Sequence, residues 1–472
     1  MPSPNAFAYL MILIWPVVAW VLWTRLDAAR ALIWTILAGY LFLPPLTGFN
    51  LPVVPDLDKT SIPNLVCLLF ALTLRHDRIS FLPDSWLGRG LIGVYILSPF
   101  ATVMTNSDPI PILVEDVPGL RIYDSAAAVI NQAIYLLPFF LARRYLATPE
   151  AMRVLVVAFV TAGLVYSVPM LIESRLSPQM NVWVYGFFQH DFSQTIRFGG
   201  FRPVVFLPHG LWVAFFALMC LVSSQMLFRE GPAEQRPKQL VVMLYLFWML
   251  MICKSAGPVI YALCLTPLVL LAGRRVQVFA AAAAAFVVLT YPLLRGLHLI
   301  PLDAIMATAE RFSPDKASSL GFRIYNEELL LQRAALKPWF GWGGYGRSLL
   351  LNPITGEIET IADGAWIIVL GIYGWFGYIA EFGLISLPIW LLAREVVLQR
   401  AATFPLAGAA LALILAANMV DMLPNGTNVP LTWLMAGALL GQAEALRRAR
   451  LERAAEARRQ ELHSGHPIRT VI

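Results

Sequence analysis

Apolar runs of close to bilayer length recur along almost the whole chain, and this feature most constrains its fold. About 20 apolar residues are enough for an α-helix to cross the hydrocarbon core of a membrane. That core offers the backbone no hydrogen-bond partners, so each run must satisfy its own backbone as a helix. Charged residues make up only 14% of the chain and hydrophobic residues 58%. The sequence therefore predicts an all-α integral membrane protein.

The apolar runs predict about 12–13 transmembrane helices. The predicted spans are residues 6–23, 31–46, 62–74, 90–104, 125–142, 153–171, 204–227, 239–253, 258–273, 276–294, 374–393, 403–420 and 430–446. Residues 1–294 then form the N-terminal helices, and residues 364–446 the C-terminal helices. Residues 295–363 form one long extracytoplasmic loop with short helices, and residues 447–472 form a basic tail.

Lysine and arginine are unevenly divided between alternate loops, which predicts an orientation. The loops near Arg25, Arg75, Arg143, Arg229 and Arg274 are rich in these residues, whereas the alternate short loops carry few. Because cytoplasmic loops are enriched in Lys and Arg, the first set and the tail are expected inside the cell. The N-terminus and the long loop are then expected outside. The basic tail could lie near acidic lipid.

The cysteine and charge patterns suggest neither a metal site nor nucleic-acid binding. Cys67, Cys220, Cys253 and Cys264 lie in or beside apolar runs, without the spacing of metal ligands or disulfides. Buried free thiols are the expected state. The net charge of +6 follows the loop asymmetry of a membrane protein, so no nucleic-acid partner is expected.

The long loop carries two features that suggest chemistry. Residues 319–336 are predicted to be a helix with Arg323 near its start, ended by Lys337-Pro338. A pair between Arg323 and Glu327, one turn apart, is the structural alternative for this arginine. The segment PWFGWGGYGRS follows, with glycines for tight turns and the rings of Trp339, Trp342 and Tyr345. Such rings suit sugars, and an aromatic belt at the membrane interface is the alternative.

The order of these segments resembles the O-antigen ligase and O-antigen polymerase superfamily of bacterial envelope enzymes. In that family a periplasmic loop holds an Arg-bearing helix, a glycine–tryptophan turn, and a His that begins the return into the membrane. Glycines follow that His by eleven and fourteen residues, as Gly374 and Gly377 follow Asp363 here. Asp363 therefore occupies the position of the family's His. The segments IRFGGFRPVVFLPHG (196–210) and CKSAGPVIYAL (253–263) resemble two further family segments.

The resemblance implies a glycosyltransferase of the bacterial inner membrane that acts on its periplasmic face. It would move a glycan from an undecaprenyl-diphosphate-linked oligosaccharide to a hydroxyl acceptor, without a metal or other cofactor. Other envelope polysaccharide assembly proteins could be partners. A diphosphate leaving group needs cations beside it, and the planar fork of arginine fits phosphate oxygens. The resemblance assigns catalysis to Arg202, Arg323 and Asp363, and substrate binding to Arg197, Lys254, Trp342, Tyr345 and His209.

The role of Asp363 has two interpretations at this stage. It could take the acceptor's proton as a general base, or it could cap the helix that follows it. His190 and His209 flank the arginine segment and could supply the missing His. Asp421 and Asn425 could bind an acceptor sugar or merely form a turn.

The absence of the ligase-type His favours a polymerase of O-antigen or exopolysaccharide. A ligase that transfers glycan to a lipid or protein acceptor is the alternative within the class. A transporter or flippase of lipid-linked glycan is the alternative from another class. An ionisable residue within a span is typical of transport paths, and Glu381 is the clear case here.

Overall fold

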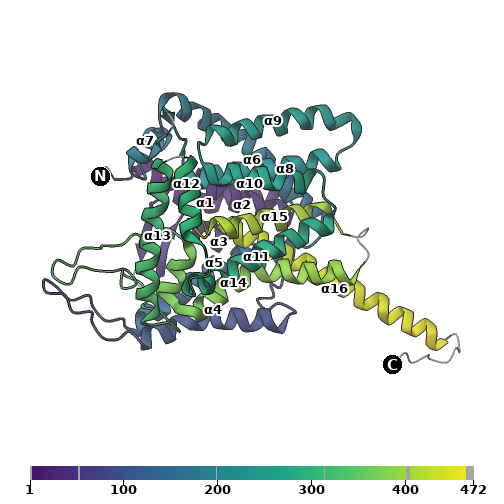
Figure 1. Ribbon diagram of the computed structural model, residues 1–472. Coiled ribbons are helices and arrows are strands. Elements are labelled where there is room, and N and C mark those ends of the chain that lie inside the picture. The colour runs from purple at the N-terminus through teal and green to yellow at the C-terminus, as the bar shows by residue number, and fades with distance from the viewer. Residues whose placement is uncertain (1–2, 52–53, 198, 313, 400–403, 464–472) are drawn as a thin grey trace.

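The structure is a computed structural model that describes residues 3–51, 54–197, 199–312, 314–399 and 404–463. It is a bundle of helices, most of which run in the same direction or its opposite (Figure 1). The first eight helices are α1 (Ala6–Arg25), α2 (Ala28–Phe42), α3 (Ser61–Thr73), α4 (Trp86–Met104), α5 (Ile122–Tyr145), α6 (Pro149–Leu176), α7 (Met180–Tyr185) and α8 (Gly210–Glu230). The others are α9 (Arg236–Ile252), α10 (Ala256–Leu270), α11 (Arg274–Gly296), α12 (Leu302–Phe312), α13 (Pro314–Ala335), α14 (Ala365–Leu398), α15 (Leu406–Asp421) and α16 (Pro430–His463).

Two small antiparallel hairpins are the sheet structure of the described residues. In the first, β1 (Gly48–Leu51) pairs with β2 (Val54–Asp58), with Gly48 opposite Asp58. In the second, β3 (Ile196–Arg197) pairs with β4 (Gly200–Phe201), with Arg197 opposite Gly200. The second hairpin carries the arginine–glycine segment that was singled out in the sequence.

The prediction of an all-α membrane protein is confirmed at this coarse level. Seven described helices are long and apolar enough to cross a membrane, namely α1, α4, α5, α6, α8, α11 and α14. Four shorter apolar helices, α2, α3, α10 and α15, pack among them. The structure has a helix at each of the thirteen predicted positions, α9 and α16 being the remaining two. Only seven of them are both long enough and apolar enough to cross a membrane by this measure, which is fewer than the 12–13 expected.

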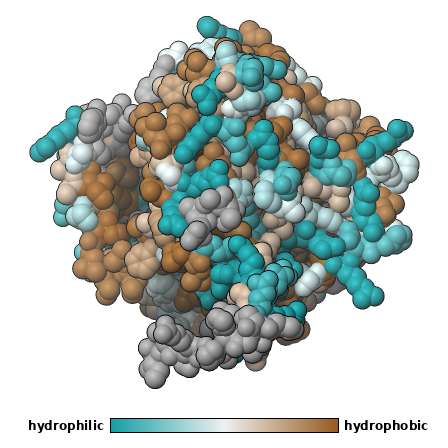
Figure 2. All heavy atoms as spheres, turned by 90° about the vertical axis from the view of Figure 1, so that its right-hand side faces the viewer, coloured by the Kyte–Doolittle hydropathy of each residue, from teal (hydrophilic) through white to brown (hydrophobic). Residues whose placement is uncertain are grey.

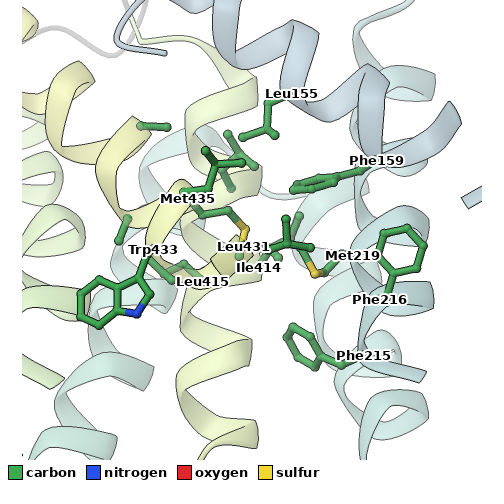
Figure 3. Packing of buried hydrophobic residues seen from close by; sticks show 14 of the residues in the cluster. Leu155, Phe159, Phe215, Phe216, Met219, Ile414, Leu415, Leu431, Trp433 and Met435 are labelled. Atoms are coloured by element: carbon green, nitrogen blue, oxygen red, sulfur yellow. The ribbon is translucent and has the colours of Figure 1, made fainter. Parts of the chain in front are cut away.

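The hydrophobic core joins helices from both halves of the chain. Phe159 of α6 and Phe216 of α8 pack near Ile414 of α15 and Leu431 of α16 (Figure 3). These four side chains are at most 2% exposed. The N-terminal and C-terminal helix sets predicted from the sequence therefore share one core.

The loops fall into two groups at opposite ends of the bundle. At one end, Arg143 binds Glu444, Arg153 binds Glu230, and Arg450 binds Glu395. This is the end from which α16 extends (Figure 1), and hydrophilic side chains cover much of its face (Figure 2). At the other end α13 crosses the bundle, and the N-terminus and α7 also lie at this end (Figure 1). The alternate loops of the charge analysis are thus separated as predicted.

Three local expectations need correction. The loop helix begins at Pro314 rather than near Ser319, so Arg323 lies in its middle. Proline suits a first helical turn, because its missing N–H would have no partner there. The helix after Asp363 begins at Ala365 and continues to Leu398, with a kink at Gly374 inside one apolar run. Cys67, Cys220 and Cys253 are buried as expected, but Cys264 is exposed.

Candidate functional site

The aromatic turn after α13 is bonded to the kink of α14, so two separate sequence motifs form one unit. The N–H groups of Trp342 and Gly343 donate to the carbonyls of Gly371 and Ile372, over 2.8 and 2.9 Å. In the other direction, Trp375 and Phe376 donate to the carbonyls of Pro338 and Trp339. A kink leaves helix backbone groups without their usual partners. The turn supplies those partners and fixes α13 against α14.

Glycine is required on both sides of this junction. Gly374 has φ 65°, in the left-handed region that favours glycine. A Cβ at this position would lie 2.4 Å from the backbone carbon of Trp339. Gly341 has φ 66°, and its Cβ would lie 2.5 Å from the carbonyl of Ile372. The spacing of glycines in the sequence thus reflects two backbones in direct contact.

The junction places Arg323 of α13 beside Asp363, just before α14. Arg323 Nε lies 3.4 Å from Asp363 Oδ2, and the two side chains are 34% and 41% exposed. Arg323 also donates an Nη1 hydrogen bond to the carbonyl of Pro424. The alternative of an Arg323–Glu327 ion pair is not the one observed among the described residues. A half-exposed pair contributes little to stability, and a ligand can compete for it.

Asp363 does not cap the helix that follows it. Gly364 is the N-cap residue, and no side chain caps this end of α14. The first amide, that of Ala365, donates instead to the carbonyls of Met422 and Asn425. The capping interpretation is therefore wrong. The Asp363 carboxylate remains available for a role at the site.

Arg202 lies buried on the loop between β4 and α8. Its side chain donates from Nη2 to Ser255 Oγ over 2.5 Å. The residue is 4% exposed, and its Nε has no hydrogen-bond partner among the described residues. Leaving a buried cationic donor unpaired costs free energy. Among the residues that the structure describes, Arg202 is therefore a charged group with spare donors and without a counter-charge in contact, which is typical of an anion-binding site.

Lys254 and Arg197 complete this cationic group. Lys254 Nζ donates to the carbonyl of Arg197 over 3.0 Å, which joins the segment before α10 to the β3–β4 hairpin. Two glycines give the cations their space. A Cβ on Gly200 would lie 2.4 Å from Lys254 Nζ, and one on Gly210 would lie 2.6 Å from Arg202 Nε. The glycines of the 196–210 segment thus admit the two cations.

The arginines from distant segments act on one another electrostatically. Burial, together with the charges of Arg197 and Arg323, lowers the pKa of Arg202 to about 10. Arg323 lies more than 100 residues further along the chain. The fold therefore gathers the three arginines predicted from the sequence at the same end of the bundle, with Asp363 beside one of them.

The two histidines are also near this group, but His209 is not suited to act as a base. The His190 and His209 rings lie 4.4 Å apart. Burial, followed by the charge of Arg202, lowers the pKa of His209 to about 3, so the ring is neutral at pH 7. Its Nδ1 accepts a hydrogen bond from the N–H of Leu211 at the start of α8. The proton of the neutral ring is then on Nε2, which donates to Gln194 Oε1 over 3.3 Å.

The two predicted sugar-binding aromatics have different surroundings. Trp342 packs under cations, with the Arg333 guanidinium 3.5 Å and Lys337 Nζ 4.8 Å from its ring centroid. Its indole N–H donates to the carbonyl of Arg333. Trp342 is thus held in the loop by cation–π contacts. Tyr345 is 75% exposed and donates its hydroxyl to Asp124. Of the two, Tyr345 presents its ring for a ligand.

The polar residues near the end of α15 form a structural turn. Asp421 accepts hydrogen bonds from Asn425 Nδ2 and Thr427 Oγ1, and is 2% exposed. The carbonyl of Asn425 caps the first amide of α14. The turn interpretation fits Asp421 and Asn425 better than sugar binding. Glu381 accepts a hydrogen bond from Asn428, so this ionisable residue of α14 is paired within the protein.

Two further acidic residues contribute to the site, and the sequence did not single out the first of them. Glu173, at the end of α6, accepts hydrogen bonds from the amides of Met180, Val204 and Val205, which fixes the backbone directly after Arg202. Burial raises the pKa of Glu327 to about 7, while the charges of Arg295 and Arg323 lower it. The signal for Glu173 in the sequence was an acidic residue at the end of an apolar run.

Comparison with known proteins adds no relative. No protein-family model matches the chain, and no curated protein matches it. The geometry alone therefore describes the site. It combines a buried guanidinium with spare donors, two further arginines, a lysine, and a carboxylate in an exposed ion pair. Such an arrangement can bind a polyanion and accept a proton.

Proposed function

We propose that this protein is a membrane glycosyltransferase that uses an undecaprenyl-diphosphate-linked oligosaccharide as its donor. The observation that carries the proposal is the convergence of Arg197, Arg202 and Arg323, with Asp363 in contact with Arg323. A diphosphate carries several negative charges, and planar guanidinium groups bind its oxygens in pairs. The exposed aromatic ring of Tyr345 suits a glycan.

In the proposed reaction, a hydroxyl oxygen of the acceptor attacks the anomeric carbon of the donor sugar. The new carbon–oxygen bond forms as the bond to the diphosphate oxygen breaks. Arg202 and Arg323 stabilise the charge that develops on the departing diphosphate. The hydroxyl proton passes to Asp363 late in the transition state. Undecaprenyl diphosphate and a lengthened glycan are the products, and no cofactor is consumed.

The ion pair between Arg323 and Asp363 would set the order of two steps, donor binding first and proton transfer second. A donor diphosphate that binds Arg323 competes with the Asp363 carboxylate for the same guanidinium. The carboxylate is then released from its ion pair and is free to face the acceptor hydroxyl. Donor binding would therefore prepare the base. We place the reaction on the periplasmic face of a bacterial inner membrane, with the α13 end outside and the C-terminal part of α16 in the cytoplasm.

A polymerase of surface or exopolysaccharide, including O-antigen, is the activity we favour. Asp363 replaces the His of the ligase-like pattern. The acceptor in a polymerase is itself a lipid-linked glycan, so donor and acceptor come from one pool.

Purified full-length protein in lipid nanodiscs tests the proposal directly. It is supplied with undecaprenyl-diphosphate-linked oligosaccharide extracted from the host strain, and the products are resolved by mass. The expected products are glycans of two or more repeat units together with free undecaprenyl diphosphate. Unchanged substrate with wild-type protein, under conditions in which membranes of the same strain are active, would overturn it.

A further inference from the structure

A cavity of about 460 Å³ lies at the same end of the bundle as the candidate site, on the other side of the aromatic turn. Its walls come from β2, the ends of α4 and α5, the turn residues Gly343–Tyr345, and Tyr373 of α14. None of the residues assigned to the cationic group lines it. A volume of this size holds a small ligand such as one or two sugar rings.

The lining of this cavity has the chemistry of a carbohydrate site. Three tyrosines, Tyr135, Tyr345 and Tyr373, contribute rings with polar edges. The other polar side chains include the carboxylates of Asp56, Asp58 and Asp124, the amide of Asn131, and the hydroxyls of Ser61 and Thr102. Aromatic faces pack against the C–H surface of a sugar, while carboxylate and amide oxygens accept hydrogen bonds from its hydroxyls.

Several of these polar groups have capacity to spare. The side chains of Asp56 and Asn131 bond to no residue in the part of the chain that the structure describes. Asp58 uses Oδ1 to accept from the amides of Thr60 and Ser61, so its Oδ2 is free of those bonds. Asp124 accepts from Arg121 N on one oxygen and from Tyr345 Oη on the other. Hydroxyl groups of a ligand can therefore donate to at least three of these residues, Asp56, Asp58 and Asn131.

A second cavity borders the first at two shared residues. It measures about 430 Å³, is mostly apolar, and runs from Ile361 and Ala362 to Gly344 and Tyr345. Ala362 is the residue before Asp363. Gly344 and Tyr345 line both cavities. Tyr345 thus stands between a space next to Asp363 and the carboxylate-lined space beyond it.

From this placement we propose that the larger cavity binds neutral or amino sugar residues of the acceptor glycan. The proposal rests on the proposed function and adds a binding subsite to it. Three carboxylates would repel a diphosphate or a uronic acid, which excludes the donor's head group from this cavity. Sugar hydroxyls or a sugar ammonium group would be favoured. The acceptor would extend along the face of Tyr345, so that its terminal hydroxyl lies near Asp363.

A photo-crosslinking residue tests the occupant in the complete protein. p-Benzoylphenylalanine is placed at Asn131, on the cavity wall. The matched control carries it at Ile130, the preceding residue of α5, which is 37% exposed and does not line the cavity. Cells that make the glycan are irradiated, and the purified protein is stained for periodate-sensitive sugar. We expect glycan adducts at Asn131 in excess of those at Ile130 by about tenfold. Their absence at Asn131, in a strain where this variant still assembles glycan, would overturn the proposal.

A second pair of variants keeps the proposal testable if the crosslinking residue disturbs folding. Ala128→Phe fills the cavity, whereas Ala126→Phe adds the same ring to α5 at a position outside the cavity lining. At equal protein level in the membrane, Ala128→Phe is expected to lower glycan output by about tenfold and Ala126→Phe to leave it unchanged. Normal output from Ala128→Phe would contradict the site.

The two hypotheses fail in different ways. Intact glycan assembly by Arg323→Ala together with adducts at Asn131 would refute the enzyme and keep the carbohydrate site. Lost assembly by Arg323→Ala without adducts at Asn131 would refute the site and keep the enzyme.

Discussion

Replacing Gly374 by alanine should break the junction between the aromatic turn and α14. The added methyl group has no space, because its position lies 2.4 Å from both the carbon and the oxygen of the Trp339 carbonyl. Those are backbone atoms, which cannot swing aside as a long side chain can. The four hydrogen bonds between the turn and the kink would then lengthen or break together.

The expected loss of stability follows from two separate costs. A left-handed backbone at φ 65° costs an alanine roughly 1 kcal/mol. Forcing a group into a filled space costs about 1–3 kcal/mol more. The Gly374→Ala variant should therefore lose roughly 2–4 kcal/mol. Activity should fall further than stability alone requires, because Arg323 and Asp363 lie on the two elements that the junction aligns.

Thermal unfolding of the purified protein in detergent measures this prediction. Gly90→Ala is the matched control, since Gly90 lies in α4 and nothing lies within 4 Å of its added methyl group. That control should keep or slightly raise the melting temperature, because alanine favours a helix over glycine. Equal melting temperatures for Gly374→Ala and wild type would refute the account of the junction.

Three further predictions concern single side chains. Arg347 is 1% exposed and donates to the carbonyls of Pro118, Asp108 and Trp342. Arg347→Ala should therefore cost about 3 kcal/mol or more in thermal stability. Arg175→Ala, at an exposed position on the same end, should cost almost nothing. Equal losses of stability in the two variants would contradict the structural role of Arg347. The pKa of Glu327 is about 7 in the folded state, above its unfolded value, so its contribution to stability is complete at low pH and is lost as the pH rises through 7. Melting temperatures from pH 5 to 8 should fall with pH in wild type and less in Glu327→Gln, and parallel curves would contradict this. Because Asp363 caps no helix, the variants Asp363→Asn and Asp363→Ala should both fold normally. Both should lose roughly a hundredfold in the rate of glycan transfer. Near-normal transfer by the Asn variant would exclude Asp363 as the base.

The sequence predicted the fold at the level that hydropathy and charge determine. Apolar runs gave the positions of the helices, because the bilayer leaves the backbone no other solution. Helix length was less predictable, since several apolar runs end early at turns and pack inside the bundle. The start of α13 was misplaced by about five residues, because the predicted helix began at residue 319 whereas the observed helix begins at Pro314.

Part of the candidate site was predictable from the order of motifs, and part was not. Arg202, Arg323 and Asp363 were assigned from the family resemblance of the segments that carry them. The reason for the glycines emerged only in three dimensions, because Gly210 makes room for Arg202 and Gly374 for the backbone of Trp339. Burial likewise distinguishes the roles of arginines whose roles could not be told apart from the sequence. Arg347 and Arg323 lie in the same loop region, yet the burial of Arg347 and its three carbonyl partners give it a structural role.

The central claim is that Arg202 and Arg323 together bind and stabilise a diphosphate-linked donor. Surface-polysaccharide output in a deletion strain, normalised to protein level in the membrane, tests it most directly. Arg202→Ala and Arg323→Ala should each abolish output at normal protein level, and the Lys variants should recover little, because one ammonium does not replace a bidentate guanidinium. Arg175→Ala should retain full output. Wild-type output from both alanine variants would contradict the account.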